Sequence, residues 1–467
     1  MRQVDAVVVG AGPNGLAAAL TLAREGLSVE LFDQDEHLGG GCRTETWGDG
    51  YLSDWGAAVH PMALASPFFR SVGLTELVEF AIPEISFAHP LADRAAIAWR
   101  SLEQTADDLG RDGRSWRALM AGLVDDHLQI ADAVLSPPPT LALHPLVGMR
   151  LAKAAVSAYR GAGLRTPGGQ ALLAGVVGHS VGRQPQLGTS AVGVVLAALA
   201  HSVGWPIPLG GSAAITRALS NELERLGVAI HRSVKVCSMQ ELPRARAYLF
   251  DTSARDLLTI AQNQVNSRYV KALRRVRPGD AVSKVDLILS GPIPWSDPRL
   301  SDAGTVHLGG TAADIREAEQ LVAAGRHSAS PAIVLSQPSR FDPTRAPGGL
   351  HSVWAYSHVP AGSPEPQTDV VVSSIEKHAP GVRDLLVTSR ATTARDIADR
   401  NPTMVAGDFA SGAITTRQIL ARPNMSPTPW RAARHIYLCS AATAPGPGVH
   451  GMSGFGAART ALRDHFA

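Results

Sequence analysis

The sequence predicts an α/β protein built from two interleaved domains. The chain has 467 residues, enough for two or three domains with a sizeable buried core. Residues 4–33 have the pattern of a strand, a glycine-rich turn, a helix and a second strand. Residues 434–466 have the pattern of a strand, a Gly/Pro-rich loop and a helix, a unit too small to fold alone. We therefore expect both ends of the chain to share one Rossmann-like sheet.

The first strand, turn and helix contain the residues that a dinucleotide site requires. Val4–Gly10 is rich in β-branched residues, as a buried parallel strand is, and the Ala- and Leu-rich segment Leu16–Glu25 favours a helix. Gly10 permits the tight turn between them, Gly12 allows a pyrophosphate to approach the backbone, and Gly15 lets the helix pack close to the strand. The helix N-terminus then offers N–H groups and positive potential to the phosphates.

An acidic residue and a second glycine cluster indicate which nucleotide binds. Asp33 ends the next strand, 23 residues after Gly10, where a carboxylate can accept hydrogen bonds from an adenosine ribose. The cluster Gly39–Arg43 follows, an arrangement that resembles the FAD enzymes of the glutathione-reductase-like superfamily. Arg43 is expected to face a phosphate or the flavin edge. The middle of the chain shows no second GxGxxG unit, so the sequence predicts one FAD and no nicotinamide domain.

The C-terminal unit is expected to close the same site. Arg434–Leu438 is predicted to be a strand, and a helix is predicted from Met452 onward. In the flavoproteins that this pattern resembles, the last helix points its N-terminus at the flavin N1–C2 carbonyl edge, where it stabilises negative charge. The backbone of Met452, Ser453 and Gly454 is expected at that edge.

Three histidines are candidate catalytic residues. His450 lies in the loop before the last helix, His60 follows the second glycine cluster, and His351 lies in a predicted strand region. Each is interpreted in two ways, as a proton donor or base on the substrate side of the flavin, or as a structural histidine with its hydrogen bonds satisfied.

Composition excludes several other classes of protein. The 43 Lys and Arg against 41 Asp and Glu give a net charge of +2, which provides no electrostatic case for nucleic acid. The cysteines Cys42, Cys237 and Cys439 form no CxxC pair, which argues against a disulfide framework and a four-cysteine zinc site. No metal-spaced cluster, P-loop or Ser-His-Asp pattern is present. The longest nearly uncharged apolar run, Ala191–Ala200, is half the length of a membrane span.

The same features predict where the protein is found. The strand pattern that begins at Val4 leaves no room for a signal peptide, and the scattered cysteines suit a reducing compartment. We expect a cytoplasmic protein, with peripheral membrane contact as an open alternative.

Several blocks along the chain resemble the phytoene-desaturase-related FAD oxidoreductases. Within that family they are most similar to the branch named after pyridine nucleotide-disulfide oxidoreductase domain-containing protein 2. The blocks cover almost the whole chain and read VVGAGPNGLAAAL, GGGCR, GWPIPLGGS, LFDTSARDLL, GLHSVWAYSHVP, NPTMVAGD, RQILARP and IYLCSAATAPGPGVHGMSGF. Two small departures, Asp33 where Glu is commoner and Pro447 where Gly is usual, do not threaten FAD binding.

The resemblance implies a bound FAD and redox chemistry on carbon–carbon bonds of an apolar substrate. The residues assigned to the cofactor from the motifs and the resemblance are Gly10, Gly12, Pro13, Asn14, Gly15, Asp33, Gly40, Gly41, Arg43, Val236, Met452, Ser453 and Gly454. Val236 is expected in a strand, with its backbone near the adenine. The substrate region is shorter than in carotenoid desaturases, which argues against a long carotenoid-type substrate.

The expected domains are discontinuous in sequence. The FAD-binding domain is predicted to comprise residues 1–70, 201–261 and 396–467. The α+β substrate domain is predicted to comprise residues 71–200 and 262–395.

The predicted activity is hydride transfer between flavin N5 and an apolar, unsaturated or lipid-like substrate. Oxygen or a quinone is the expected electron acceptor, because no nicotinamide domain is visible. Two alternatives stay open, an amine-oxidase-like enzyme on the same fold and a flavoprotein scaffold or assembly factor without turnover. Desaturation, saturation, isomerisation and amine oxidation all use this framework.

Overall fold

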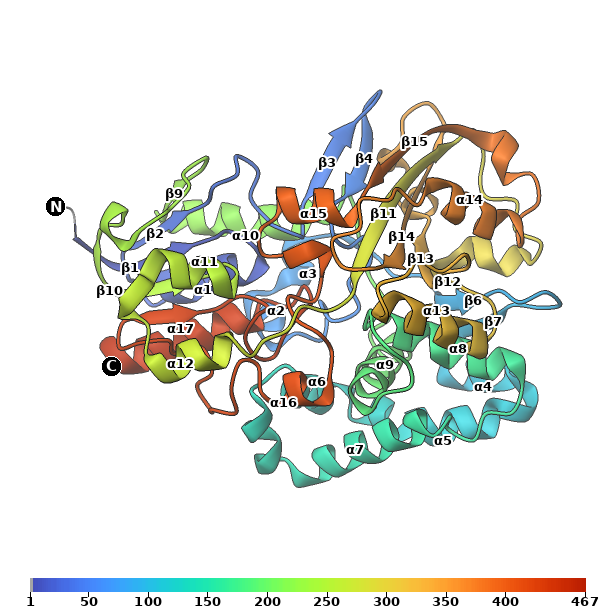
Figure 1. The fold of residues 1–467 in the computed structure, drawn as a ribbon, viewed down its shortest axis with the longest axis horizontal. Coiled ribbons are helices and arrows are strands. Elements are labelled where there is room, and N and C mark those ends of the chain that lie inside the picture. The colour runs from blue at the N-terminus through green and yellow to red at the C-terminus, as the bar shows by residue number, and fades with distance from the viewer. Residues whose placement is uncertain (1–2) are drawn as a thin grey trace.

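Both ends of the chain contribute strands to one parallel sheet. The computed structural model describes residues 3–467, and within them five strands pair in the order β16-β10-β1-β2-β9, all parallel. Their bounds are β1 Gln3–Val9, β2 Val29–Phe32, β9 Ala229–His231, β10 Arg244–Phe250 and β16 Ile436–Leu438. The prediction that the two terminal units share a Rossmann-like sheet is confirmed, and Figure 1 shows both termini beside it.

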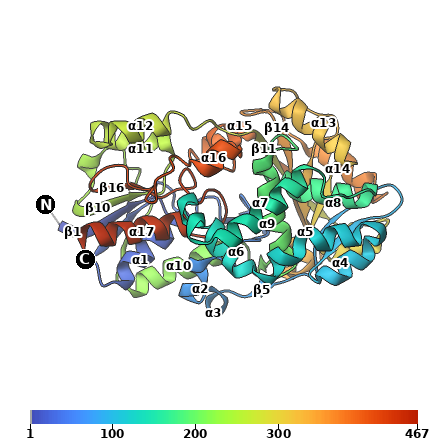
Figure 2. The same cartoon turned by 90° about the horizontal axis from the view of Figure 1, so that it is seen from below.

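Helices cover both faces of this first sheet because its strands are apolar on both sides. Alternate residues of a strand point to opposite faces, so Val8 packs on one side and Val7 on the other. Figure 2 shows the two helical layers on either side of the strands. One layer contains α1 (Pro13–Arg24), α10 (Ala213–Arg225) and α17 (Met452–His465), and the other contains α11 (Ala254–Ala261) and α12 (Ser267–Leu273).

A second, mixed sheet forms the other half of the molecule (Figure 1). Its order is β15-β11-β14-β13-β12-β6-β7, antiparallel except for the parallel pair β6 and β12. The strands are β6 Ile85–His89, β7 Ala96–Trp99, β11 Ala281–Leu289, β12 Ala303–Leu308, β13 Ile333–Ser336, β14 His351–Val359 and β15 Leu386–Thr392.

A helical layer packs against this second sheet and reaches back toward the first. Trp116 and Trp205 are fully buried in its core, together with Phe87 of β6. The helices of residues 67–200 are α2 Pro67–Val72, α3 Leu74–Leu77, α4 Leu102–Asp108, α5 Gly113–Asp125, α6 His127–Val134, α7 Pro145–Tyr159, α8 Pro167–Gly178 and α9 Leu187–Ala200. The later helices are α13 Ala312–Ala323, α14 Thr368–Glu376, α15 Ala394–Arg400 and α16 Thr416–Leu420.

A short hairpin joins the two halves. β3 (Thr44–Trp47) and β4 (Tyr51–Asp54) follow the second glycine cluster and lie against the second sheet. The Ser53 hydroxyl donates to Asp286 in β11 at 2.6 Å, and Trp354 Nε1 in β14 donates to the Asp54 carbonyl at 2.8 Å. A second small pairing joins β5 (Phe80–Ala81) to β8 (Ile207–Pro208).

One predicted element is wrong. Residues 234–238, expected as a strand that carries Val236, lie outside the sheets in an extended loop that follows β9. The Val234 N–H instead donates to the Asp33 carbonyl oxygen, just beyond β2, at 2.8 Å, so this segment does not continue as a strand beside β9. The strands of the two sheets fall in the two sets of segments proposed as domains, whose residue limits stay a prediction. Across residues 3–467, no helix combines the length and the apolar character needed to cross a bilayer.

Candidate functional site

A large cavity lies where the carboxyl ends of the first sheet meet the helical layer. Its volume is about 1010 Å³, which is at the upper end for ligand sites. One end is lined by the glycine-rich turn after β1, and the other by side chains of α6, α7 and α9. Parallel α/β sheets bind their ligands at this edge, so the cavity is the candidate site.

The glycines of the turn are required by close approaches of backbone. Gly10 has a φ of +95°, and a Cβ there would lie 2.4 Å from the Asp251 carbonyl oxygen. A Cβ on Gly15 would lie 1.9 Å from the Gly10 carbonyl oxygen. Gly12 and Gly40 approach each other across the cavity wall, since a Cβ on Gly40 would be 3.3 Å from the Gly12 Cα. Of the glycine residues assigned to the cofactor in this region, Gly10, Gly12, Gly40 and Gly41 line the cavity, as do Pro13 and Asn14, and Gly15 packs behind them.

Asp33 lies where an adenosine ribose is expected. Its Oδ2 accepts the Ala11 N–H at 2.6 Å and its Oδ1 accepts the Asp35 N–H at 2.8 Å. Burial raises the pKa of Asp33. Val236 lines the cavity from the loop after β9, although it is not in a strand.

Arg43 lines the cavity, but its guanidinium group already has a partner. Its Nη1 pairs with the Asp35 carboxylate, and the guanidinium lies 5.2 Å from the centre of the Trp55 ring. Its Nε has no hydrogen-bond partner among the described residues. Glu45 Oε1 lies 3.6 Å from this Nε, so two carboxylates hold the guanidinium group at the wall.

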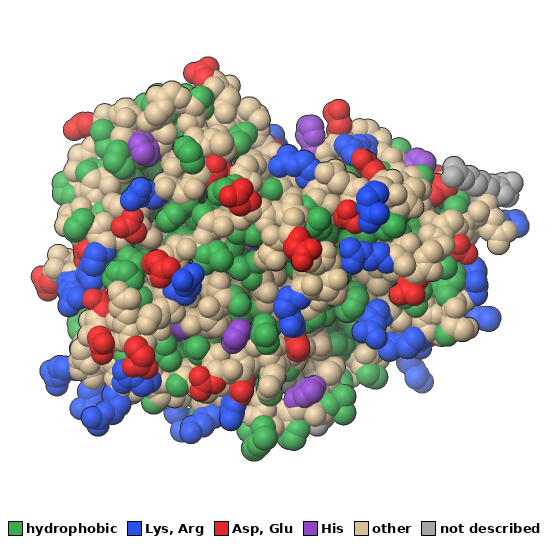
Figure 3. Space-filling model, turned by 180° about the vertical axis from the view of Figure 1, so that it is seen from behind, with side chains coloured by type: hydrophobic (Ala, Val, Ile, Leu, Met, Phe, Trp, Pro, Cys, Tyr) green, Lys and Arg blue, Asp and Glu red, His purple; other side chains and the backbone are tan. Residues whose placement is uncertain are grey.

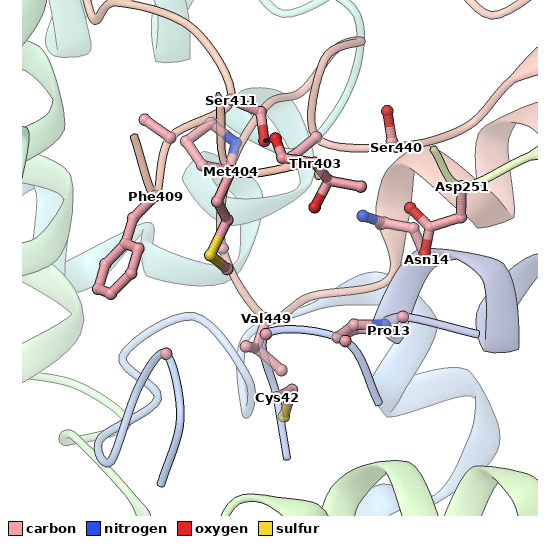
Figure 4. A pocket seen from close by; sticks show the side chains of 18 of the residues that line it. Pro13, Asn14, Cys42, Asp251, Thr403, Met404, Phe409, Ser411, Ser440 and Val449 are labelled. Atoms are coloured by element: carbon pink, nitrogen blue, oxygen red, sulfur yellow. Dashed lines mark hydrogen bonds between the residues drawn. The ribbon is translucent and has the colours of Figure 1, made fainter. Parts of the chain in front are cut away.

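Asp251, which the sequence analysis did not select, lies at the N-terminus of α1. It follows β10, and its Oδ2 accepts the Gly15 N–H at 2.8 Å. Burial, with a smaller contribution from the Asp33 charge, raises the pKa of Asp251 to about 7. Figure 4 shows its carboxyl group beside the Asn14 side chain, on the side of the cavity where Pro13 and Ser440 lie. The helix N-terminus predicted to be free for phosphates is thus shared with a carboxyl group.

The cavity is lined by the loop before the last helix, up to two residues before the predicted Met452. Val449 and His450 line the cavity, whereas Met452, Ser453 and Gly454 do not. The Met452 N–H donates to His450 Nδ1 at 3.0 Å, so it is not free for a ligand. A Cβ on Gly454 would lie 1.8 Å from the Asn14 carbonyl oxygen, which shows that this turn of α17 is packed against α1.

Of the three candidate histidines, the structure brings two to the cavity. His450 and His60 line it, and burial lowers the pKa of each to about 4, so both rings are neutral near pH 7. His60 Nε2 lies 2.8 Å from the Ser212 hydroxyl oxygen. His351 begins β14 opposite Leu289 and does not line the cavity, so it is not placed at the site.

Four buried polar atoms at the cavity wall have no partner in the described part of the chain. They are Asn14 Oδ1, Arg43 Nε, His60 Nδ1 and His450 Nε2. Buried polar groups are normally hydrogen-bonded, so this set indicates a polar ligand that spans the wall from the glycine turn to the last helix. A dinucleotide such as FAD fits this requirement.

The other end of the cavity is apolar. Its lining includes Val134, Leu135, Leu151, Val181, Val192, Val195 and Leu196. The acidic residues that line the cavity are Asp33, Asp35 and Asp251, which follow strands of the first sheet, and Asp256, which lies in the first turn of α11. In the described cavity lining, α6, α7 and α9 contribute no carboxylate.

Loop residues that the sequence analysis missed complete the wall. Met404 and Phe409 come from the segment between α15 and α16 and project into the cavity (Figure 4). Tyr356 of β14 also lines the cavity. Phe68, Phe69, Trp205 and Trp354 do not line it and pack in the hydrophobic core.

Comparison with known proteins agrees with this architecture. Residues 8–70 match the model of the NAD(P)-binding Rossmann-like domain. The chain is 24% identical over 555 aligned residues to pyridine nucleotide-disulfide oxidoreductase domain-containing protein 2 from Mus musculus, covering 99% of this chain and 94% of that protein. The resemblance to this branch, predicted from the sequence, is confirmed, and the relation to phytoene desaturases stays an inference.

Solved oxidoreductase structures share the fold along the whole chain. An oxidoreductase from Methanosarcina mazei has a TM-score of 0.62 at 15% identity, covering 99% of this chain and 100% of its own. Cyclohexylamine oxidase from Brevibacterium oxydans has a TM-score of 0.62 at 14% identity, covering 99% and 98%. The chain thus has the fold of these oxidoreductase structures, and its Rossmann-like nucleotide-binding domain agrees with the predicted dinucleotide site.

Proposed function

We propose that this protein is an FAD-dependent oxidoreductase that transfers a hydride between the flavin and an apolar, unsaturated or lipid-like substrate. The observation that carries the proposal is the continuity of the cavity, which runs from the glycine turn to the apolar side chains of α6, α7 and α9. A polar cofactor suits one end of this cavity and an apolar substrate suits the other.

The residues of the nucleotide end would hold FAD. The turn Gly10–Asn14, Asp33, Gly40–Arg43 and the loop residue Val236 line that end, and His450 lines the cavity in front of the last helix. When bound, FAD would supply a hydride acceptor or donor at its N5 atom.

Two neutral imidazoles are available to hold a proton near the reacting atoms. His450 Nδ1 accepts the Met452 N–H, so its proton is on Nε2, and His450 lines the cavity. Nε2 makes no hydrogen bond of normal geometry in residues 3–467, although the Gly446 and Pro447 carbonyl groups lie close enough to offset part of the lowering of the His450 pKa. His60 is arranged in the opposite way, because the Ser212 hydroxyl donates to the Ala57 carbonyl oxygen and therefore accepts from His60 Nε2. Its Nδ1 is left as a bare proton acceptor. We propose His450 as the proton donor on the substrate side, because its orientation is held by a backbone N–H.

Amine oxidation is the second candidate, since cyclohexylamine oxidase shares the fold. The helical end of the cavity argues against amine oxidation, because α6, α7 and α9 contribute no carboxylate to the described lining. An ammonium group there would lose its water without gaining a partner of opposite charge. The third candidate, a scaffold without turnover, leaves the orphaned Nε2 of His450 without a role.

The test is anaerobic reduction of the purified protein. Polyenes, acyl lipids and primary amines are mixed separately with the FAD-bound protein, and the visible flavin band is followed. We expect an acyl lipid or polyene to bleach the band and oxygen or a quinone to restore it. Bleaching by amines alone would establish the second candidate, and no bleaching by any class would favour the scaffold.

We also propose that the apolar substrate is collected at a lipid surface. Leu146 and Met149 of α7 are exposed, as is Met425 after α16, whereas Leu151 of the same helix α7 lines the cavity. Figure 3 shows hydrophobic side chains at the lower edge of the molecule, the edge along which α7 lies in Figure 1. Co-flotation with neutral phospholipid vesicles, lost in Leu146→Asp but kept in Glu84→Gln, would support the contact. Co-flotation kept in Leu146→Asp would contradict it.

A further inference from the structure

Two histidines meet at the helical end of the cavity, apart from the groups used above. His179 follows α8 and lines the cavity, and its Nε2 lies 2.7 Å from Nε2 of His307 in β12. His307 is buried, whereas His179 is half-buried with a surface toward the cavity. Burial lowers the pKa of His179 to about 3 and lowers the pKa of His307 far below its usual value, so both rings are neutral.

One arrangement of protons suits this pair better than the other. A neutral imidazole has one N–H and one bare nitrogen, and the contact between the two Nε2 atoms uses one of each. His307 Nδ1 is buried without a hydrogen-bond partner in the described chain, and a Cβ on Gly175 would lie 2.8 Å from it. A proton on His307 Nδ1 would be an orphaned donor, which folded proteins avoid. His307 therefore donates from Nε2, and the proton of His179 is on Nδ1, the nitrogen left for the cavity.

Aromatic packing fixes the direction of this donor. The Trp205 ring lies edge-on to His179 with 5.1 Å between ring centres, and Trp205 Nε1 donates to the Leu196 carbonyl oxygen at 3.1 Å. Phe87 stacks on Trp205 at 4.9 Å and also contacts the His307 ring. A donor held in this way needs no reorganisation when a ligand arrives.

We propose that His179 donates a hydrogen bond to an oxygen atom of the substrate, so that the substrate is an uncharged apolar molecule with a carbonyl or similar oxygen acceptor. Around the donor, the lining is made of apolar residues such as Val181 and Val195. A neutral N–H group in an apolar cavity favours the binding of a hydrogen-bond acceptor and disfavours the binding of an ammonium group, which has only donors. The proposal rests on the proposed function, because it names the class of substrate for the same cavity.

The test compares three ligands of matched size by calorimetry on the FAD-bound protein. Octan-2-one presents a carbonyl oxygen, 2-methyloct-1-ene has a CH₂ group in its place, and octylamine presents an ammonium group. We expect octan-2-one to bind about fivefold more tightly than the alkene, the factor that a single neutral hydrogen bond provides. In His179→Phe this preference should vanish, and in His179→Gln, which keeps a donor, it should be partly retained. Equal binding of ketone and alkene by the parent protein, or tighter binding of octylamine, overturns the proposal.

Two further variants distinguish a specific role of His179 from a general loss of packing around the cavity. His307→Leu lies behind the cavity wall and should weaken the ketone preference by freeing the His179 ring, whereas an unchanged preference overturns the pairing argument. His201 is the matched control, because it is a buried imidazole that accepts from Trp116 Nε1 at 2.9 Å and does not line the cavity. His201→Phe should keep the preference, and its loss there would overturn the assignment to His179. If the protein takes up no FAD, the proposed function fails, but the same ligand preference measured on FAD-free protein still decides this proposal.

Discussion

The two ends of the cavity are built in opposite ways. At the nucleotide end the wall is mostly backbone, and its residues come from short turns where a side chain would collide with a neighbouring carbonyl group. At the helical end the wall is mostly side chain, and its parts come from separate helices, such as Val134 of α6 and Val195 of α9. We therefore expect the nucleotide end to tolerate almost no substitution. The shape of the helical end depends on side-chain packing, so substitutions there should change it gradually.

This difference separates binding of the cofactor from choice of the substrate. Changes at the backbone turns are expected to remove the cofactor altogether, and changes at the helices are expected to alter preference among ligands. The following predictions test this difference between the two ends of the cavity, and they begin with the largest expected effect.

The largest effect is expected from Gly12→Asp. A Cβ at Gly12 would lie 2.6 Å from Asp251 Oδ2, so the new carboxylate would meet a buried carboxyl group beside the expected pyrophosphate. We expect the affinity for FAD to fall at least about 100-fold, or about 3 kcal/mol, and the protein to purify colourless. Gly26→Asp adds the same charge where nothing lies within 4 Å and should stay yellow. A fully yellow Gly12→Asp protein would show that the phosphate assignment is wrong.

Gly454→Ala tests the contact between the two ends of the chain. Its Cβ would lie 1.8 Å from the Asn14 carbonyl oxygen, so α1 and α17 would have to separate. We expect the free energy of unfolding to fall by about 3 kcal/mol, measured by urea denaturation. Gly122→Ala in α5 is the control, because the nearest atom to its Cβ is 4.0 Å away and alanine favours the helix. Equal stability of the two variants would contradict the packing argument.

Asp251→Asn tests the carboxyl group at the N-terminus of α1. The folded protein keeps the Asp251 proton up to about pH 7, whereas the unfolded chain releases it near the ordinary pKa of 3.8. The folded state therefore binds more protons in this range, and its unfolding free energy should fall as the pH rises from 3.8 to about 7 through this group. A nearby pyrophosphate also favours the protonated form, so FAD affinity should fall above about pH 7, by at most about tenfold per pH unit.

Fluorescence titrations with FAD at several pH values measure this effect. Asp251→Asn should bind FAD with little dependence on pH in that range. Asp256→Asn removes another cavity-lining carboxylate and should keep the dependence of the parent protein. A pH dependence that is the same in Asp251→Asn and in the parent protein would assign it to another group.

The smallest effects on stability separate two of the candidate histidines. His450→Ala removes the acceptor for the Met452 N–H, so we expect a loss of about 1 kcal/mol in stability, with FAD still bound. It should also slow the reduction of the flavin in stopped-flow experiments, by about 100-fold if His450 is the proton donor. His351→Ala, outside the cavity, should change stability by less than about 0.5 kcal/mol and leave the reduction rate unchanged. Equal reduction rates in both variants would leave His450 with a structural role alone.

Residues close together in sequence were the predictable part of this site. The turn from Gly10 to Gly15 and the acid at Asp33 were predicted because a tight turn, a helix start and a strand end leave local marks in the sequence. Met452, at the start of the last helix, was predicted at the cavity, whereas His450 lines it instead. The bond from the Met452 N–H to His450 Nδ1 depends on a side-chain rotamer, which the sequence does not reveal. His351 was a wrong choice for the site, since strand register alone decides on which part of the sheet it lies.

Asp251 and His179 were outside the reach of such reasoning. Asp251 becomes a partner of the Gly15 N–H because β10 pairs in parallel with β1 and ends beside the turn, across 236 positions. His179 Nε2 acquires a partner because His307 meets it from a strand of the second sheet. Neither contact leaves a pattern in the local sequence, because each depends on how distant strands and helices pack against one another.

The amino-acid sequence alone determined that the two ends of the chain form a parallel sheet with a glycine turn suited to a dinucleotide. Steric limits on φ, ψ and close backbone approach act between near neighbours, and therefore they can be read from the order of residues. The tertiary structure alone decided which side chains face the cavity, which carboxyl group shares the N-terminus of α1, and which nitrogen of His179 is left for a ligand. Burial and hydrogen bonding between distant segments set these properties, since both depend on what surrounds a group in space.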